Sequence, residues 1–292
     1  MRNVIRVLVF IAYIVALAAG FLLFAEPPSK TDDRAKVSGI VEKILKADYG
    51  DDRPGLTRLY GELAPYAAQT GDKMFASRVR YWRGFALWRR VLNGFNDKAP
   101  KEEQEKDIAG CVAEFDEALA LDPGFTDARV GKTSCLISLW SLDRQNQENR
   151  DTAMKHLTAL REESKAVGAG NPRVLLMVAA SAWYAPPERG GGQAKAIEMY
   201  GEALIVARRK PEKADPLDPT WGEPEVLSNL AWANLNKDTP DLDAAEANAK
   251  AALAIVPYWH YARDILMQNI RNAREGKPRA TPPAPTPAAS SS

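Results

Sequence analysis

The sequence predicts an all-α protein built from successive antiparallel helix pairs. Apolar residues recur at helical spacing along most of the chain, whereas the alternation typical of strands is almost absent. Clusters of Gly, Pro and Asp separate these stretches where turns are needed. A short pattern of small and aromatic residues also recurs between the breakers, as closely packed helix pairs require. Helix is therefore expected to follow helix, without a sheet.

The composition is that of an ordinary globular body. Of the 292 residues, 46% are hydrophobic and 26% are charged, which supplies enough apolar material for a sizeable core. The net charge is only +1, and no long basic run occurs. Since proteins that follow a phosphate backbone concentrate Lys and Arg on one surface, we expect no nucleic-acid partner.

Residues 1–26 carry a membrane-targeting pattern. Arg2 and Arg6 precede an uncharged apolar run at residues 7–25, which is about as long as the ~20 helical residues that cross a bilayer. The positive charge before the run predicts a cytoplasmic amino end and an exported remainder. Two interpretations remain: an anchor in a bacterial inner membrane with the rest facing the periplasm, or a signal peptide cut near Gly20 that releases the protein to the periplasm. We favour the anchor, because the run exceeds a usual signal-peptide core.

Three further segments follow the apolar run. Residues 27–34 contain prolines and charges without an apolar period, which predicts a linker. Residues 35–273 are expected to form the folded helical domain. Residues 274–292 form a tail rich in Pro, Ala and Ser, whose composition predicts disorder because it offers little to bury.

The first expected helices of the domain each show one apolar stripe. Breakers then separate the helices at residues 50–52, 71–72, 122–124, 168–172, 186–192 and 211–219. The residues of the two stripes are Ile40, Val41, Ile44 and Leu45 in the first, and Leu56, Leu59, Tyr60 and Leu63 in the second.

A repeated packing pattern lies in the middle and at the end of the domain. It consists of a small residue, an aromatic residue four later, a small residue three later and a proline five beyond that. Small side chains at these positions let two helices approach closely, and the proline ends the second helix. The pattern comprises Cys111, Phe115, Ala118 and Pro123, then Ala196, Tyr200 and Ala203, and finally Ala245, Ala249, Ala252 and Pro257, where alanine replaces the aromatic residue.

This pattern resembles the second helix of the tetratricopeptide repeat. Leu227, Leu230 and Ala231 match the family's first helix, with Asn234 where the family prefers an aromatic residue, and the segment from Tyr81 to Trp88 approximates an earlier copy. The resemblance covers about residues 81–270 as about four irregular helix pairs. The chain is similar to exported bacterial repeat proteins of this family. The resemblance implies a right-handed superhelical solenoid with a concave groove, but no particular activity.

The resemblance implies a set of groove residues. Aromatic residues and Arg dominate protein-binding surfaces, since they bury a large area and still offer a hydrogen-bond donor. The competing interpretation is that aromatic residues at helical spacing form the core between helices. The groove candidates are Tyr81, Phe85, Trp88, Arg89, Trp183, Tyr184, Trp232 and Asn236.

No pattern predicts catalysis, a metal site or a cofactor. The two histidines, His156 and His260, have no second His or Cys at ligand spacing, and Asp264 beside His260 makes only a pair. Gly190–Gly192 follow no strand, so they predict a turn and not a phosphate-binding loop. Nucleophile and kinase motifs are absent from the sequence.

Two cysteines, Cys111 and Cys135, leave two alternatives. Export permits a disulfide, but two cysteines also serve as small apolar side chains in a helical core. We favour two buried free thiols.

The sequence therefore favours a non-catalytic scaffold or adaptor of the cell envelope that binds a protein or peptide partner. The first alternative is a small-ligand or transport-associated binding protein, like the repeat proteins that accompany tripartite ATP-independent periplasmic transporters. That function needs an enclosed pocket. The second alternative is an enzyme, which needs a cavity lined by several titratable groups.

Overall fold

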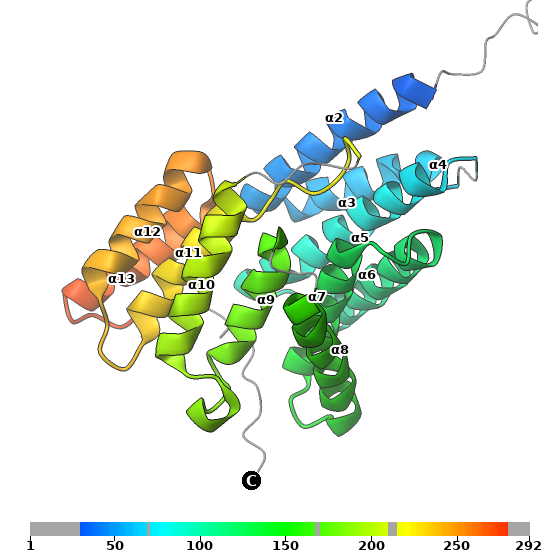
Figure 1. Ribbon diagram of the computed structural model, residues 1–292. Coiled ribbons are helices and arrows are strands. Elements are labelled where there is room, and N and C mark those ends of the chain that lie inside the picture. Colours follow the sequence, from blue (N-terminus) through cyan, green and yellow to red (C-terminus); the bar gives the residue numbers. More distant parts are fainter. Residues whose placement is uncertain (1–29, 69–70, 167–169, 210–214, 280–292) are drawn as a thin grey trace, which may run out of the picture. The chain divides into compact units, whose positions relative to one another are not determined.

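A computed structural model describes residues 30–68, 71–166, 170–209 and 215–279. The described residues are mostly helical and contain no strand, so the expected all-α class is confirmed for them (Figure 1). Contacts between Cα atoms divide the chain into two units, residues 1–36 and residues 37–292, with the boundary inside the first described helix. In the first unit, Lys36 forms an ion pair with Asp32 one helical turn earlier.

Several helices of the second unit begin at side-chain caps. Asp52, Asp72, Asn171 and Asp241 each accept a hydrogen bond from a backbone N–H of the first turn, which offsets the unpaired donors there. The described helices are α2 Lys30–Tyr49, α3 Arg53–Glu62, α4 Ala64–Ala67, α5 Lys73–Asn96, α6 Lys101–Leu121, α7 Thr126–Leu142, α8 Gln147–Ala166, α9 Pro172–Ala182, α10 Gln193–Arg208, α11 Glu223–Asn236, α12 Leu242–Ile255 and α13 Met267–Arg274, with a 3-10 turn at Pro187–Arg189 and a π-helical turn at Tyr261–Leu266.

Four helix pairs follow one another along the second unit. They are α5 with α6, α7 with α8, α9 with α10 and α11 with α12, and each pair is joined by a connection and packs side by side (Figure 1). The first member of each pair also contacts the first member of the next, so that α5, α7, α9 and α11 form a row. This row brings side chains from helices far apart in sequence onto one surface.

The small residues of the repeated pattern are the buried seam of α6, α10 and α12. On α6 the seam holds Phe115, whose ring fits between two glycines. A Cβ on Gly84 would lie 3.0 Å from this ring, and a Cβ on Gly131 would lie 2.2 Å from it. Pro123 and Pro257 lie just beyond the ends of α6 and α12. The fully or almost fully buried seam residues are Cys111, Phe115, Ala118, Ala196, Tyr200, Ala203, Ala245, Ala249 and Ala252.

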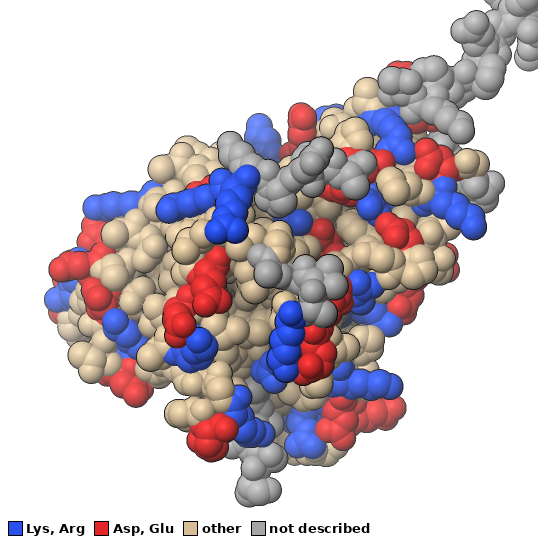
Figure 2. All heavy atoms as spheres, viewed as in Figure 1, with Lys and Arg blue, Asp and Glu red and all other residues tan. Residues whose placement is uncertain are grey.

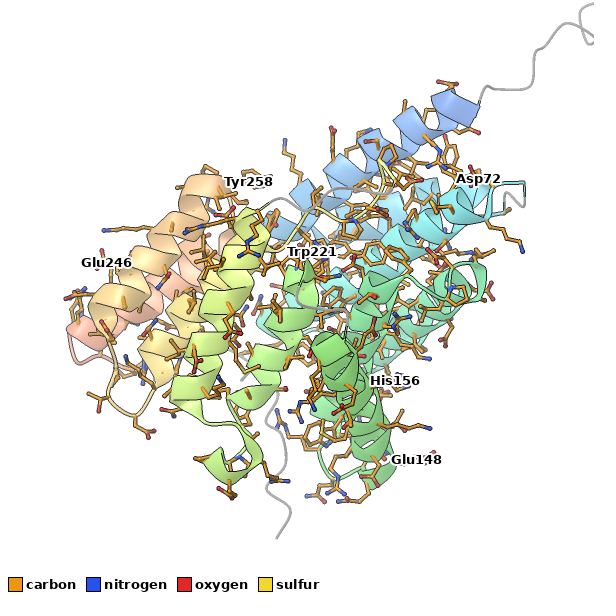
Figure 3. All side chains as sticks on the ribbon, in the orientation of Figure 1. Asp72, Glu148, His156, Trp221, Glu246 and Tyr258 are labelled. Atoms are coloured by element: carbon orange, nitrogen blue, oxygen red, sulfur yellow. A yellow bond between two sulfur atoms is a disulfide. The ribbon has the colours of Figure 1, made fainter. Side chains whose placement is uncertain are left out.

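The segment before α11 inserts into the core around α5. Trp82 Nε1 donates to Leu217 O at 2.8 Å, and Trp221 Nε1 donates to Tyr81 Oη at 2.8 Å. Trp221 is labelled in Figure 3, and only 5% of its surface is exposed. A segment about 140 residues downstream of α5 therefore completes the core of the first helix pair.

The expected pair of free thiols is wrong. Cys111 of α6 and Cys135 of α7 form a disulfide, with their Cα atoms 6.7 Å apart. Both residues are fully buried, as expected, and the close approach of α6 to α7 brings their sulfur atoms together. The spacing within α6 alone could not show that the second cysteine faces the same seam.

The two ends of the chain meet the expectations only partly. The expected linker at residues 27–34 is helical from Lys30, because α2 begins there. The expected anchor at residues 1–26 lies outside the described residues, and none of the described helices is long and apolar enough to cross a membrane. At the carboxyl end, α13 ends at Arg274, and residues 275–279 of the predicted tail are placed against the folded domain.

Candidate functional site

A polar hollow of about 400 Å³ lies over the row of first helices. Its walls come from α5, α7, α11 and the segment after α12, and they combine amide, hydroxyl and aromatic side chains with two arginines. We call it the polar hollow. Its lining residues are Arg89, Leu92, Asn93, Phe95, Asn96, Ser138, Ser141, Arg144, Glu225, Ser228, Asn229, Trp232, Trp259 and Tyr261.

An apolar hollow of about 180 Å³ lies beside it, between α5, α7, α8 and α9. The two hollows share Leu92 and Ser138 in their walls, so they are neighbours on one surface. A dry cavity of about 150 Å³ can hold a benzene-sized group. The apolar hollow is therefore large enough for one apolar side chain. Its lining residues are Trp88, Leu92, Ser134, Ile137, Ser138, Trp140, Met154, Leu157, Met177, Ala180 and Ser181.

Helical spacing explains how polar side chains reach the polar hollow. Residues three, four or seven positions apart lie on the same face of a helix. On α11 that face carries Glu225, Ser228, Asn229 and Trp232 in succession. On α5 the corresponding positions are 89, 93 and 96, and on α7 they are 134, 138 and 141. Three helices thus present one polar stripe each to the same surface.

Buried ion pairs and hydrogen bonds connect the helices beneath the polar hollow. Arg89 Nε lies 2.8 Å from Asp48 Oδ1, and Asn93 Nδ2 donates to Asp48 O at 3.1 Å. Burial raises the pKa of Asp48, and the neighbouring Arg89 opposes this shift. Tyr49 Oη donates to Glu225 Oε1 at 2.6 Å, while burial and Glu225 together raise the pKa of this tyrosine. These contacts tie α2 both to α5 and to the first turn of α11.

One donor in the apolar hollow has no partner among the described residues. Trp88 is only 5% exposed, and its Nε1 is buried without a hydrogen bond. A buried unpaired N–H costs about 1–3 kcal/mol, so this donor lowers the stability of the packing around Trp88. The apolar hollow thus offers mainly apolar area, with Ser134, Ser138 and Ser181 as the polar residues in its wall.

The predicted groove residues fall into three groups. Trp88 lines the apolar hollow, and Arg89 and Trp232 line the polar hollow. Tyr81 and Phe85 instead belong to the fully buried core, where their ring centroids lie 6.2 Å apart. For these two residues the structure favours the competing interpretation of core packing.

The other three predicted groove residues lie along the edge of the polar hollow or outside it. Trp183 packs edge-on against Trp232 with ring centroids 5.1 Å apart. Tyr184 has a buried hydroxyl with no hydrogen-bond partner among the described residues, and burial raises its pKa. Asn236 lies one turn beyond Trp232 on α11, and its side chain donates to Trp232 O at 2.8 Å.

The residues that sequence reasoning missed are mainly the small polar ones. Asn96, Ser138, Ser228 and Asn229 line the polar hollow although nothing about each residue alone is distinctive. A search for polar residues at helical spacing inside otherwise buried helices would have found them. Polar side chains are uncommon on a core face, so several at helical spacing indicate a polar surface. Trp259 and Tyr261 also line the polar hollow, and they were not among the predicted groove residues.

A third hollow, of about 860 Å³, surrounds the connection between α11 and α12. Charged and loop residues such as Lys237, Asp238 and Arg274 line it, and no aromatic side chain contributes. It is larger than the polar hollow and includes Ile197 and Leu242 in its wall, but it lies at the ends of α10, α12 and α13, away from the row of first helices. We therefore place the candidate site over the row of first helices.

The described residues contain no cluster of three or more His, Cys, Asp or Glu side chains that could hold a metal ion. His260 lies between two carboxylates, with Nδ1 3.3 Å from Asp51 Oδ2 and Nε2 3.8 Å from Asp264 Oδ2. His156 lies on α8, and burial and Lys132 lower its pKa (Figure 3). Neither histidine lines the polar or the apolar hollow.

Charges of both signs mix over the visible face of the molecule. Figure 2 shows Lys and Arg interspersed with Asp and Glu, without a continuous area of one sign on that face.

Comparisons with protein-family models, with curated proteins and with solved structures find no match to this chain.

Proposed function

We propose that this chain is a non-catalytic binding protein that holds an extended segment of a protein partner over α5, α7, α9 and α11. The observation that carries the proposal is the neighbouring pair of hollows: a polar one with amide and hydroxyl groups for a peptide backbone, and an apolar one for a side chain. Extended peptides bind in this way, through main-chain hydrogen bonds and pockets for individual side chains.

The row of helices supports a solenoid related to the tetratricopeptide repeat as the framework. In such a framework each first helix packs on the next, and the row forms the inner surface. The contacts of α5 with α7, α7 with α9 and α9 with α11 are of this kind. The buried small residues of α6, α10 and α12 lie where close helix approach requires them.

The sequence supports a location at a bacterial membrane. If residues 1–26 anchor the chain in the inner membrane, the hollows face the periplasm, and the anchor raises the local concentration of the site near membrane proteins. We accordingly propose an envelope scaffold or adaptor, with a protein or peptide as partner and without nucleic acid.

A matched pair of variants tests this function in the full chain. Asn96→Trp fills part of the polar hollow, whereas Asn248→Trp places the same side chain on α12, away from both hollows. Both asparagines are half-buried. Wild-type and variant chains are used to capture proteins from the membranes of cells that make them, and mass spectrometry quantifies what is retained.

We expect at least a tenfold loss of specific partners with Asn96→Trp and no loss with Asn248→Trp. Equal retention by both variants would overturn the assignment of the hollows as the binding site. Circular dichroism of both variants shows whether each is folded.

A second candidate function is the binding of a small ligand. Its support is the volume of the polar hollow, which lies within the ~300–1,000 Å³ of typical ligand pockets. Denaturing the purified chain and analysing the released small molecules by mass spectrometry distinguishes the two functions. A stoichiometric compound that Asn96→Trp excludes would favour this second function.

A further inference from the structure

The segment after α13 returns the chain to α11. Gly276, with a φ of 65°, ends the helix in the left-handed region that glycine adopts without strain. Lys277 N then donates to Asn272 O at 2.8 Å, and Asn272 Nδ2 donates to Pro278 O at 3.0 Å. These two bonds fix the direction in which the chain leaves α13.

Arg279 is tied to the last turn of α11. Its Nη1 donates to Leu235 O at 3.0 Å and lies 3.4 Å from Asn236 Oδ1. A cation at this place is favourable, because the last carbonyl groups of a helix have no partner within the helix and carry partial negative charge. The point from which residues 280–292 continue is therefore defined.

That point lies on the same face of α11 as the polar hollow. Asn236 follows Trp232 by one turn, and Trp232 follows Ser228 and Asn229, which also line the hollow. The distance along α11 from Asn236 to Glu225 is about 17 Å, at ~1.5 Å per residue.

The length and composition of the remaining chain suit this surface. Residues 280–292 read ATPPAPTPAASSS, with four prolines and no charged side chain. In the polyproline conformation these thirteen residues can span about 40 Å, at ~3.1 Å per residue, more than the whole face of α11. Polyproline segments bind in grooves lined by aromatic side chains, and their free carbonyl groups accept hydrogen bonds. The polar hollow offers Trp232, Trp259 and Tyr261 for the first contact and Asn96 and Asn229 for the second.

We propose that residues 280–292 dock in the polar hollow of their own chain, as an internal occupant that an outside partner must displace. This inference rests on the proposed function, since it treats the hollow as a peptide-binding surface. It makes the partner compete with a proline-rich segment whose local concentration is set by the contact of Arg279 with α11. A partner of the same chemistry, uncharged and rich in proline, fits the hollow best.

Cysteine pairs in the full chain test this proximity. Ala284→Cys is combined with Asn229→Cys in the polar hollow, or with Asn248→Cys on α12 as the matched control. The native disulfide is fully buried, so mild oxidation reports on the new pair. The rate of bridge formation is followed on non-reducing gels, and the bridged peptides are identified by mass spectrometry.

We expect the pair with Asn229→Cys to bridge at least tenfold faster than the pair with Asn248→Cys. Replacing the four prolines of residues 282–287 by glycine should slow this bridge severalfold, because a flexible segment loses the preformed conformation. That change lies outside the described helices, so it leaves the folded domain intact. Equal rates for the two pairs would overturn the proposal.

A bridged dimer whose yield rises with protein concentration would replace the intramolecular occupant by the tail of a second copy, and it too would overturn the proposal as stated. The result is independent of any partner. If the cysteines bridge but no partner is captured, this inference stands and the proposed function is contradicted. If a partner is captured but the cysteines do not bridge, the proposed function stands and this inference is contradicted.

Discussion

Helices α6 and α12 have the same position in their pairs and the same spacing of small residues, but they bury different chemistry. The buried face of α12 consists of Ala245, Ala249 and Ala252. At the same spacing α6 buries Phe115, and it adds the carboxylate of Glu114, which accepts hydrogen bonds from Arg83 Nε at 2.8 Å and other donors. The comparison shows that the shared spacing is enough for a close helix pair, whereas the larger and charged groups of α6 also contact helices outside the pair. Tyr60 of α3 donates to Glu114 Oε1, and the Phe115 ring packs against Gly131 of α7.

The largest expected difference between the two helices is at the central seam position. Phe115→Ala should lower the free energy of unfolding by about 4 kcal/mol, because it empties the space between Gly84 and Gly131. Ala249→Gly, at the equivalent position of α12, should cost only about 1 kcal/mol through helix propensity. Urea unfolding followed by circular dichroism measures both, and similar losses would contradict the comparison.

The disulfide is the next difference, since it links α6 to α7 and α12 has no such bond. Replacing Cys111 and Cys135 together by alanine should lower the free energy of unfolding by about 3 kcal/mol, from the closed loop of 24 residues. Adding a reductant to the wild-type chain should have a similar effect, and it should leave the double variant unchanged. Equal free energies of unfolding for the oxidised wild-type chain and the double variant would show that the bond adds no stability.

Two helical glycines distinguish the cost of steric crowding in the core from the gain in helix propensity that alanine brings. Gly131→Ala places a Cβ 2.2 Å from the Phe115 ring, so we expect a loss of about 2 kcal/mol. Gly201 of α10 has no atom within 4 Å of the added Cβ, so Gly201→Ala should raise stability by about 0.8 kcal/mol. Thermal unfolding should therefore show a lower stability for Gly131→Ala and a higher stability for Gly201→Ala. A gain of stability with Gly131→Ala would show that the Phe115 ring is free to move.

The smallest expected effect is at the contact of the α2–α3 turn with His260, which follows α12. Burial raises the pKa of Asp51 to about 6, Asp97 adds to the shift, and His260 opposes it. Because the folded state binds this proton more tightly than the unfolded state, the contribution of Asp51 to stability falls as the pH rises from about 4 to about 6. Asp51→Asn removes this titration and retains a residue that tolerates the positive φ of 59°.

Denaturation at pH 4 and at pH 7.5 checks the sign. Relative to wild type, Asp51→Asn should gain stability at pH 7.5 and lose most of that gain at pH 4. A variant less stable than wild type at pH 7.5 would mean that the pair with His260 outweighs burial.

The comparison of α6 and α12 also shows which parts of the fold were predictable. The seams of both helices follow from local spacing, because helical geometry alone brings residues three and four apart onto one face. The insertion of Leu217 and Trp221 beside α5 does not, since its partners lie about 140 residues away. The disulfide was missed for another reason: it depends on how α6 and α7 face one another, which the spacing within either helix does not show.

The candidate site was predictable only in part. Trp88, Arg89 and Trp232 were expected on the binding surface from residue type, and they do line the two hollows. Tyr81 and Phe85 share the same residue types and helical spacing, but they face the core. Residue type alone cannot separate these cases, because the face of α5 that each residue occupies is decided by what packs against the helix.

The most direct test of binding over the row of first helices is photo-crosslinking in intact membranes. A photoreactive amino acid replaces Asn96 in the polar hollow of the full chain, or Asn248 on α12 as the control. The account predicts a discrete crosslinked partner from position 96, absent from position 248, with the attachment site on an extended segment of that partner. Identical products from both positions, or none from position 96 while position 248 gives a partner, would contradict it.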